Sequence, residues 1–228
     1  MSSVSAAPAI TGQVTGDRNL LSQTACDALR RKLVRVDIMP GERLSEPDLR
    51  KSLGVGTSPV RDAMRRLEFE HLVVVYPRSG SYATGIALKD SRSVREARLE
   101  LEGLAATLAC QRGSDAEKRH LADLAEEWYA TAELQRRIDL GAAFHRAMYG
   151  MTRNDYLAAT AEIHLNLALR QWHFCSRVVR TPDWAGPDHR RLAAAITSRD
   201  PEEAGRRIRE HVSHHSDQIV DILAGYGL

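Results

Sequence analysis

Apolar residues recur at helical spacing through the first third of the chain, and turn-forming residues divide them into short segments. A first helix is predicted to end near Asp37, just before the turn residues Pro40-Gly41. Two more helices are predicted over 46–52 and 59–71, because each carries an apolar stripe and Gly54 ends the shorter one. A short helix, a tight turn and a second helix in this order are typical of a helix-turn-helix.

The pattern changes to short runs of β-branched and aromatic residues after residue 71. Residues 72–76 and 82–86 are predicted as two strands, joined by the turn Pro77–Ser81. A hairpin that directly follows two short helices forms the wing of a winged helix-turn-helix. The first third of the chain therefore predicts a unit that holds one helix firmly enough to lie in the major groove of DNA.

The second helix of this unit turns polar side chains away from its apolar stripe. Residues at its start can bind phosphate through the helix N-terminus, and arginines further along can reach base edges. Arg78 at the hairpin tip can enter a minor groove or hold the DNA backbone. Arginines on an amphipathic helix usually form a solvated face, but the surrounding order of elements favours DNA contact here. The predicted DNA-binding residues are Thr57, Ser58, Arg61, Arg65, Arg78 and Gly80.

From residue 90 onward, Ala, Leu, Arg and Glu repeat at helical spacing, interrupted by Gly, Pro and Asn turns. An all-helical bundle is predicted, so the whole chain is mainly α. The opening segment is small, polar and without an apolar core, which predicts a disordered tail. The six predicted helices span residues 90–111, 115–131, 134–151, 155–179, 187–198 and 201–224. The predicted domains are a tail over 1–17, a winged helix-turn-helix over 18–88 and an all-helical domain over 89–228.

Charge supports this division of the chain. Residues 18–89 hold 13 Lys and Arg against 8 Asp and Glu, a net charge of +5, whereas the whole chain has a net charge of +2. The basic excess therefore lies in the predicted DNA-binding unit. No apolar run approaches the roughly 20 residues of a membrane span, and three widely spaced cysteines form no disulfide framework. We expect a soluble, cytoplasmic protein without a membrane partner.

These motifs resemble the GntR family of bacterial transcription regulators. Pro40-Gly41, Leu53-Gly54-Val55 and Pro59-Val60-Arg61 match its DNA-binding module, and the helical region is similar to the six-helix FCD domain of the FadR branch. The family's usual Ser-Arg before the recognition helix is Gly56-Thr57 here, so the family's common operator is not implied. The resemblance, which covers residues 18 to about 224, implies a DNA-binding regulator. A homodimer is expected because one recognition helix reads too few base pairs.

Three histidines stand at positions of the FCD pattern: His145, His189 and His211. The resemblance implies that they meet in the bundle interior, where three imidazoles can hold a divalent metal, most naturally Zn²⁺. Metal-binding members carry an aspartate four residues before the first histidine, and this position is Gly141 here. Water, a carboxylate effector or His164 would then complete the coordination. The alternative is that these are ordinary hydrogen-bonded core histidines.

Two arginines are candidates for binding an effector. Arg98 matches the R-x-x-L-E element of the FCD pattern together with Glu102, and Arg170 lies on the fourth predicted helix of the bundle. An arginine inside a bundle needs an anion, which indicates a small carboxylate or sugar acid. The alternative for Arg98 is an i, i+4 surface pair with Glu102. His214 and His215 are expected to face solvent.

The sequence therefore predicts a homodimeric repressor whose affinity for double-stranded operator DNA changes when a small acid binds the helical domain. One alternative is a constitutive DNA-binding regulator that has lost ligand response, for which Gly141 is the argument. Another is a metal-dependent hydrolase, because three histidines with an open position can also activate water. The absence of an HExxH arrangement and the presence of the wing argue against an enzyme.

Overall fold

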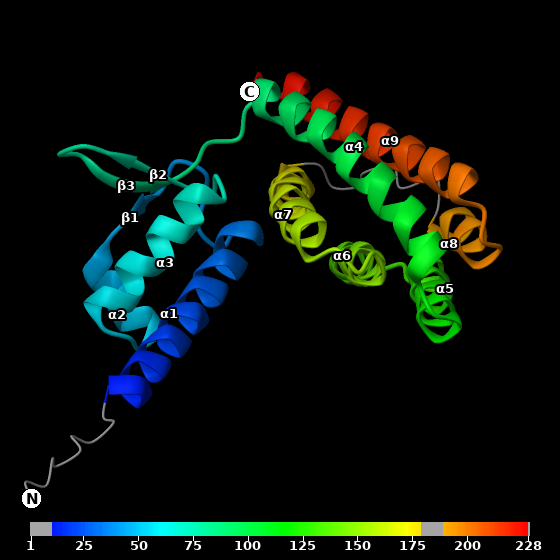
Figure 1. Ribbon diagram of the computed structural model, residues 1–228. Helices are drawn as coiled ribbons and strands as arrows, with labels where there is room; N and C mark the ends of the chain where they lie inside the picture. Colours follow the sequence, from blue (N-terminus) through cyan, green and yellow to red (C-terminus); the bar gives the residue numbers. More distant parts are fainter. Residues whose placement is uncertain (1–10, 179–188, 228) are drawn as a thin grey trace, which may run out of the picture. The chain divides into compact units, whose positions relative to one another are not determined.

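The chain forms two compact units, Met1–Gly85 and Ile86–Leu228. A computed structural model describes residues 11–178 and 189–227, and Figure 1 traces both units along the sequence. Its architecture is mainly α, with a helix-turn-helix and a small sheet in the first unit and a helical bundle in the second. None of the helices in the described residues is both long and apolar enough to cross a membrane.

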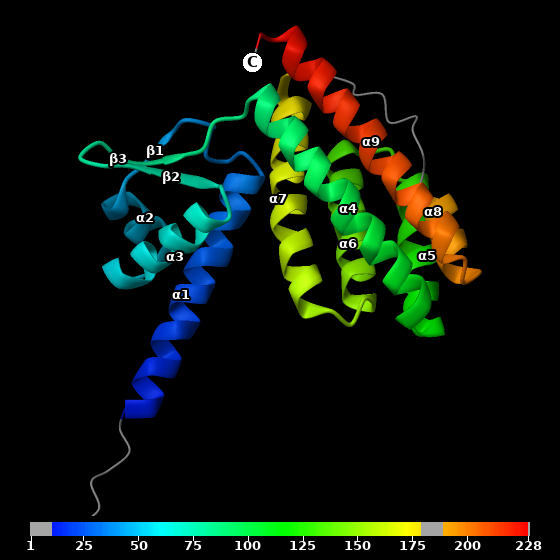
Figure 2. The same ribbon diagram turned by 45° about the horizontal axis from the view of Figure 1, so that its top comes forward.

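From residue 11 onward, the first unit contains three helices: α1 (Thr11–Val34), α2 (Glu46–Leu53) and α3 (Thr57–Phe69). Figure 2 shows α2 and α3 as two short helices joined by a tight turn. Gly54 makes this turn in the left-handed region at φ 66°, where a residue with a side chain would be strained, and its N–H donates to the carbonyl of Arg50. The predicted helix-turn-helix is confirmed, although α3 begins at Thr57 instead of Pro59.

The first helix starts earlier than the sequence predicted. Residues 11–17, expected to be part of a disordered tail, belong to α1. No proline interrupts the chain between Thr11 and Val34, so nothing stops the helix from extending toward the N-terminus. The rest of the predicted tail, residues 1–10, lies outside the described residues.

A small antiparallel sheet completes the first unit. Its strands are β1 (Arg43–Leu44), β2 (Val73–Tyr76) and β3 (Gly80–Ala83), in the order β1-β3-β2. The two wing strands pair from Val73 opposite Ala83 to Tyr76 opposite Gly80, so the second wing strand begins before the predicted residue 82. The strand β1 was not predicted, because two residues are too few for an alternating pattern.

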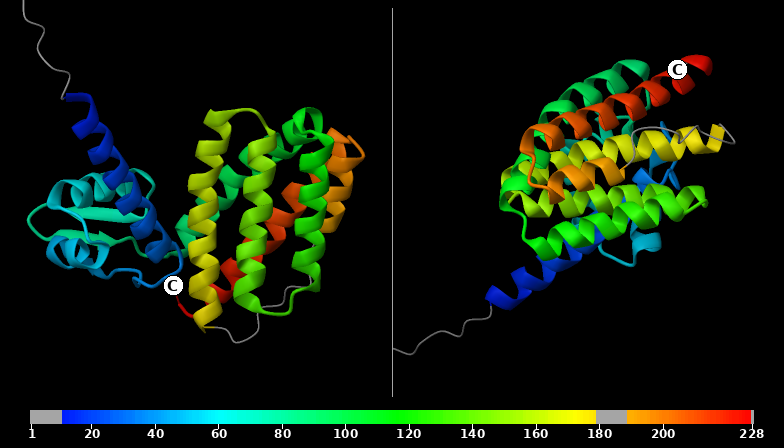
Figure 3. Two further views of the ribbon diagram at one scale, coloured as in Figure 1. Left: turned by 90° about the horizontal axis from the view of Figure 1, so that it is seen from below. Right: turned by 90° about the vertical axis from the view of Figure 1, so that its right-hand side faces the viewer.

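The described part of the second unit contains six helices, and their order is the predicted one. They are α4 (Leu88–Arg112), α5 (Asp115–Ala130), α6 (Leu134–Met151), α7 (Asp155–Val178), α8 (His189–Thr197) and α9 (Pro201–Gly225). Figure 3 shows α4 and α9 lying side by side along their length. Ser114 and Glu117 form a capping box at the start of α5, and the Asp200 carboxylate accepts the Glu203 N–H at the start of α9. The bundle therefore has well-defined helix starts that position the inward-facing side chains.

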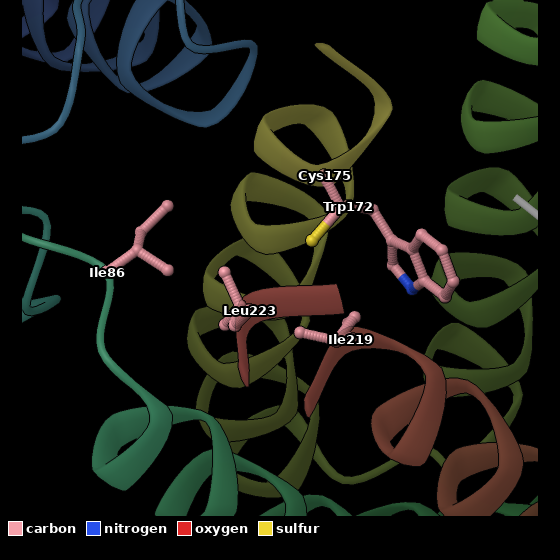
Figure 4. Packing of buried hydrophobic residues seen from close by; sticks show 5 residues of the cluster. All are labelled: Ile86, Trp172, Cys175, Ile219 and Leu223. Atoms are coloured by element: carbon pink, nitrogen blue, oxygen red, sulfur yellow. The ribbon is translucent and has the colours of Figure 1, made fainter. Parts of the chain in front are cut away.

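Buried apolar side chains hold α7 and α9 together near the start of α4. Figure 4 shows this cluster, which consists of Ile86, Trp172, Cys175, Ile219 and Leu223. The other two cysteines, Cys26 and Cys110, are buried as well, and all three are free thiols. Burial raises the pKa of each thiol, to about 11 for Cys175. All three sulfurs therefore remain protonated and shielded in the cores.

Candidate DNA interface and metal centre

The recognition helix α3 divides cleanly into a buried and an exposed face. Val60, Ala63, Met64 and Leu67 are buried, whereas Ser58, Arg61 and Arg65 are exposed and Thr57 is half-buried. The Nη1 of a further arginine, Arg66, donates to the side-chain oxygen of Gln23 at 2.6 Å, so this side chain faces α1. The predicted residues of α3 thus share one open face, which runs from the start of the helix to Arg65.

One arginine of this face is held by a carboxylate. The Nε of Arg61 lies 3.0 Å from both carboxylate oxygens of Glu46 at the start of α2. The hydrogen bond that Arg61 donates to Glu46 raises the pKa of Arg61, which stays exposed to solvent. The pair orients the guanidinium across the turn of the helix-turn-helix, and DNA would have to compete with Glu46 for it.

The hairpin tip presents a second basic group. Arg78 adopts the left-handed region at φ 64°, and the N–H of Ser79 donates to the Tyr76 carbonyl at 3.0 Å to close the turn. The Tyr82 hydroxyl donates to the Ser79 carbonyl at 3.2 Å, which braces the tip. Gly80 has φ 109°, and a Cβ there would lie 3.5 Å from the Nε of Arg43. Arg43 therefore joins Arg78 at the wing, a neighbour that sequence spacing did not reveal.

Three histidines from three helices meet in the bundle interior. His145 on α6, His189 on α8 and His211 on α9 are all buried, and one ligand atom from each lies within 4.8 Å of the others. The Nε2 atoms of His145 and His211 are 3.3 Å apart. Tetrahedral Zn²⁺ with Zn–N bonds of about 2.0–2.1 Å places its ligand nitrogens roughly 3.3–3.4 Å apart. The spacing of this pair already matches a bound ion.

Among the three histidines, His189 has the strongest need for a binding partner. Both of its ring nitrogens are buried without a hydrogen bond to the described residues. Its ring packs edge-on against Phe144 and Trp128, with centroid separations of 4.6 and 4.8 Å. Burial, followed by the nearby His211 and His145, holds its pKa well below the usual range. A neutral imidazole with unused nitrogens is the form that binds metal.

A buried ion pair orients His145. The Nδ1 of His145 lies 2.5 Å from Oε2 of Glu102, and Arg98 donates from Nε to Oε1 of Glu102 at 2.6 Å. Burial alone would raise the pKa of Glu102, but the charges of Arg98 and His145 lower it to about 2. The carboxylate therefore stays ionised and fixes the His145 ring with Nε2 toward His211, as outer carboxylates do in zinc sites. The Arg98–Glu102 pair exists, but it is buried rather than on the surface.

Gly141 lies beside the histidines, one helical turn before His145. A Cβ at this position would be 3.6 Å from Nε1 of Trp128 and 3.9 Å from Nε2 of His189, both ordinary contact distances. The absence of a side chain here therefore leaves space directly next to the histidine group. The residue types present, three buried imidazoles with one oriented by a carboxylate, fit Zn²⁺ with one coordination position left open at Gly141.

A partly open cavity with a volume of about 50 Å³ adjoins this space. Among the described residues that line it, aspartate and glutamate are absent and the arginines are Arg98 and Arg137. Its walls are formed by Arg98, Trp128, Arg137, Ile138, Gly141, Ala142, His145, Leu165, Ala168, Leu169, Trp172, His189, His211, Val212 and His215.

Three residues named in the sequence analysis lie elsewhere than expected. Arg170 is buried on α7, and burial lowers its pKa to about 10, but it does not line the cavity. His164 contacts the Thr160 carbonyl through Nδ1 at 2.9 Å and is not one of the three clustered histidines. His215 was expected to face solvent, and this is wrong. It follows His211 by one helical turn, so it shares the buried face of α9 and lines the cavity.

Sequence reasoning also missed Arg137, which belongs to an Arg-Arg pair in a polar stretch. Its neighbour Arg136 is exposed and pairs with Glu127, whereas Arg137 turns inward over the ring of Trp128. The only signal in the sequence was its spacing, since Arg137, Gly141 and His145 follow one another at intervals of four residues.

Comparisons with known proteins agree with this two-part arrangement. Residues 21–82 match the bacterial regulatory proteins of the gntR family, and residues 93–214 match the FCD domain. An uncharacterised HTH-type transcriptional regulator of Streptomyces ambofaciens is 30% identical over 86% of this chain and 84% of its own length. The HTH-type transcriptional repressor GlaR of Escherichia coli is 26% identical over 86% of this chain and 94% of its own length.

Solved structures show the same fold. Escherichia coli McbR/YncC aligns with a TM-score of 0.71 at 20% identity, covering 91% of this chain and 99% of that one. A GntR transcriptional regulator from Rhodococcus aligns with a TM-score of 0.70 at 22% identity, covering 88% of this chain and 97% of that one.

Proposed function

Because the chain belongs to the GntR family of bacterial transcription regulators and carries an FCD domain, we propose that it is a repressor controlled by a small carboxylate. In this proposal a homodimer binds operator DNA, and an acid bound beside a Zn²⁺ ion in the second unit changes its DNA affinity. The similarity to a protein named as a repressor supports the direction of control. Its relatives are transcription regulators, so hydrolysis at the histidine group is not proposed.

The observation that carries the metal part is the histidine group itself. The Nε2 atoms of His145 and His211 lie 3.3 Å apart. Both ring nitrogens of His189 are buried without a hydrogen-bond partner among the described residues. Leaving buried polar atoms unpaired costs about 1–3 kcal/mol each, and a metal ion with a ligand or water removes part of this cost. Control of DNA binding then requires only that the ligand bind the DNA-competent and DNA-incompetent arrangements with different affinity. Thermal unfolding of the Zn²⁺-loaded and chelated protein with a panel of organic acids tests this proposal.

Arg61→Ala is expected to weaken binding to an operator selected in vitro by the wild-type protein by about 1–3 kcal/mol. The reason is that Arg61 is an exposed cation at the N-terminal half of α3, oriented by Glu46. Fluorescence anisotropy at several salt concentrations checks this. If Arg61 meets a phosphate, the slope of log affinity against log salt should fall by about 1.

Arg66→Ala is the matched control for this experiment, because Arg66 lies on the same helix but faces Gln23 of α1. It should bind the selected operator nearly as well as the wild type. Wild-type affinity in the Arg61 variant would mean that this face of α3 does not contact DNA.

Glu102→Gln is expected to weaken Zn²⁺ binding by about tenfold to a hundredfold, as the loss of an outer carboxylate does in other zinc sites. The amide keeps the size of the side chain but removes the charge that lies beside Nδ1 of His145. Competition with a fluorescent chelator measures the effect. Glu162→Gln is a control, since Glu162 pairs with Arg146 at the surface. If Glu102→Gln binds Zn²⁺ as tightly as the wild type and the control do, Glu102 does not orient His145.

A further inference from the structure

Arg137 is a basic side chain that borders the cavity without taking part in the histidine group. Its guanidinium carbon lies 4.2 Å from the centroid of the Trp128 ring. Its Nε is buried and has no hydrogen bond to a described residue. Burial lowers its pKa, so the surroundings penalise the charged form. A guanidinium in such a position is stabilised when an anion binds it, and stacking on an indole fixes its orientation in advance.

The Arg137 guanidinium is close to the open position at the histidines. The Trp128 ring that it contacts also packs against His189, with a centroid separation of 4.8 Å. Arg137 and His189 are therefore neighbours of the same indole ring. Gly141, which follows Arg137 by one helical turn, leaves the intervening space unfilled. One small molecule in the cavity can reach both places.

The positive charges around the cavity favour a ligand that carries more than one negative group. Arg98 is already paired with Glu102, and imidazole ligands bring no negative charge to oppose a Zn²⁺ ion. The described residues that line the cavity include no carboxylate, so no described side chain of the wall neutralises the ion or Arg137. Apolar side chains also line the cavity, with Ile138, Leu165 and Leu169 among them. This arrangement suits a hydrocarbon chain with an acid at each end.

We propose that the cavity binds a short dicarboxylate, with one carboxylate completing the metal coordination beside Gly141 and the other bound by Arg137. This inference rests on the proposed function and specifies its ligand. It makes Arg137 the residue that distinguishes diacids from monoacids, since charge-assisted pairing of a guanidinium with a carboxylate is strong and directional.

The test compares straight-chain diacids of three to six carbons with monoacids of the same length, titrated into full-length Zn²⁺-loaded protein by calorimetry. At least one diacid should bind the wild type roughly tenfold or more tightly than its matched monoacid. In Arg137→Met this preference should disappear, while the Zn²⁺ content stays unchanged because all three histidines remain. Arg136→Met, a substitution at an exposed neighbour, should keep the wild-type preference.

The possible outcomes separate this inference from the proposed function. Equal affinity for diacids and monoacids in the wild type, or a preference that survives in Arg137→Met, would overturn the role of Arg137 but leave a carboxylate-responsive regulator. If no acid binds the Zn²⁺-loaded protein, or if the protein holds no Zn²⁺, both proposals fail together. Lysine at position 137 should restore part of the preference, because it returns the charge without the planar fork.

Discussion

His189→Ala is expected to abolish Zn²⁺ binding while the protein stays folded. The substitution removes one of three imidazoles, and two remaining histidines cannot hold the ion in a site that already lacks a protein side chain at Gly141. We expect the affinity to fall by at least about a hundredfold, consistent with the loss of a whole ligand where outer partners alone contribute 10–100-fold. Metal analysis after dialysis and chelator competition measure the change.

Folding should survive this substitution because of the unusual state of the His189 ring. Its removal opens a small cavity, but it also removes two buried nitrogens that have no hydrogen bond to the described residues. These effects oppose one another, so the chelated variant should unfold near the temperature of the chelated wild type. Zn²⁺ should raise the unfolding temperature of the wild type but not that of His189→Ala.

His164→Ala provides the matched control, since this histidine lies on α7 outside the clustered group. It should retain the metal and the Zn²⁺-dependent rise in unfolding temperature. Unchanged metal content in both His189→Ala and His211→Ala would remove the metal from the proposed function. The chain would then remain a DNA-binding regulator in which the three histidines are core residues.

Gly141→Asp is expected to tighten Zn²⁺ binding by roughly tenfold or more. A Cβ at this position would lie 3.9 Å from Nε2 of His189 and meets no atom closer than 3.6 Å, so the side chain fits and its carboxylate can reach the histidine group. A carboxylate oxygen is a normal fourth ligand of Zn²⁺, and its negative charge also offsets the ion. Chelator competition measures the affinity.

Gly141→Ala separates this coordination effect from the effect on the helix. Both substitutions replace a glycine inside α6, and alanine stabilises a helix interior by about 1 kcal/mol relative to glycine. Alanine should therefore raise the unfolding temperature of the chelated protein without changing Zn²⁺ affinity. Equal Zn²⁺ affinity in the aspartate and alanine variants would show that position 141 does not face the coordination sphere.

Much of the fold could be predicted because its boundaries depend on local chemistry. Gly54 and Gly113 follow the ends of helices, and Pro201 begins one, so the interruptions in the pattern marked the elements. The strand β1 could not be predicted, since its two residues pair with β3 far along the chain. The helical start of α1 was also missed, because small polar residues permit a helix without indicating one.

The candidate site could be predicted only in part, because some of its residues depend on how the helices pack. Spacing and resemblance indicated the three histidines, which come together as expected from three helices. The inward turn of Arg137 over Trp128 and the burial of His215 depend on how the helices rotate against one another. Sequence spacing gives the relative faces of residues on one helix, but packing decides which face is buried. Arg170 shows the converse, since it is buried without reaching the cavity.

The cluster of His145, His189 and His211 contains nitrogen donors alone, and the three thiols of the chain are buried elsewhere. Sites that hold metal through cysteine release it when peroxide or disulfide exchange oxidises the sulfur. A site built from imidazoles has no sulfur to oxidise. An ion held there would therefore not be released by oxidation of a thiol ligand.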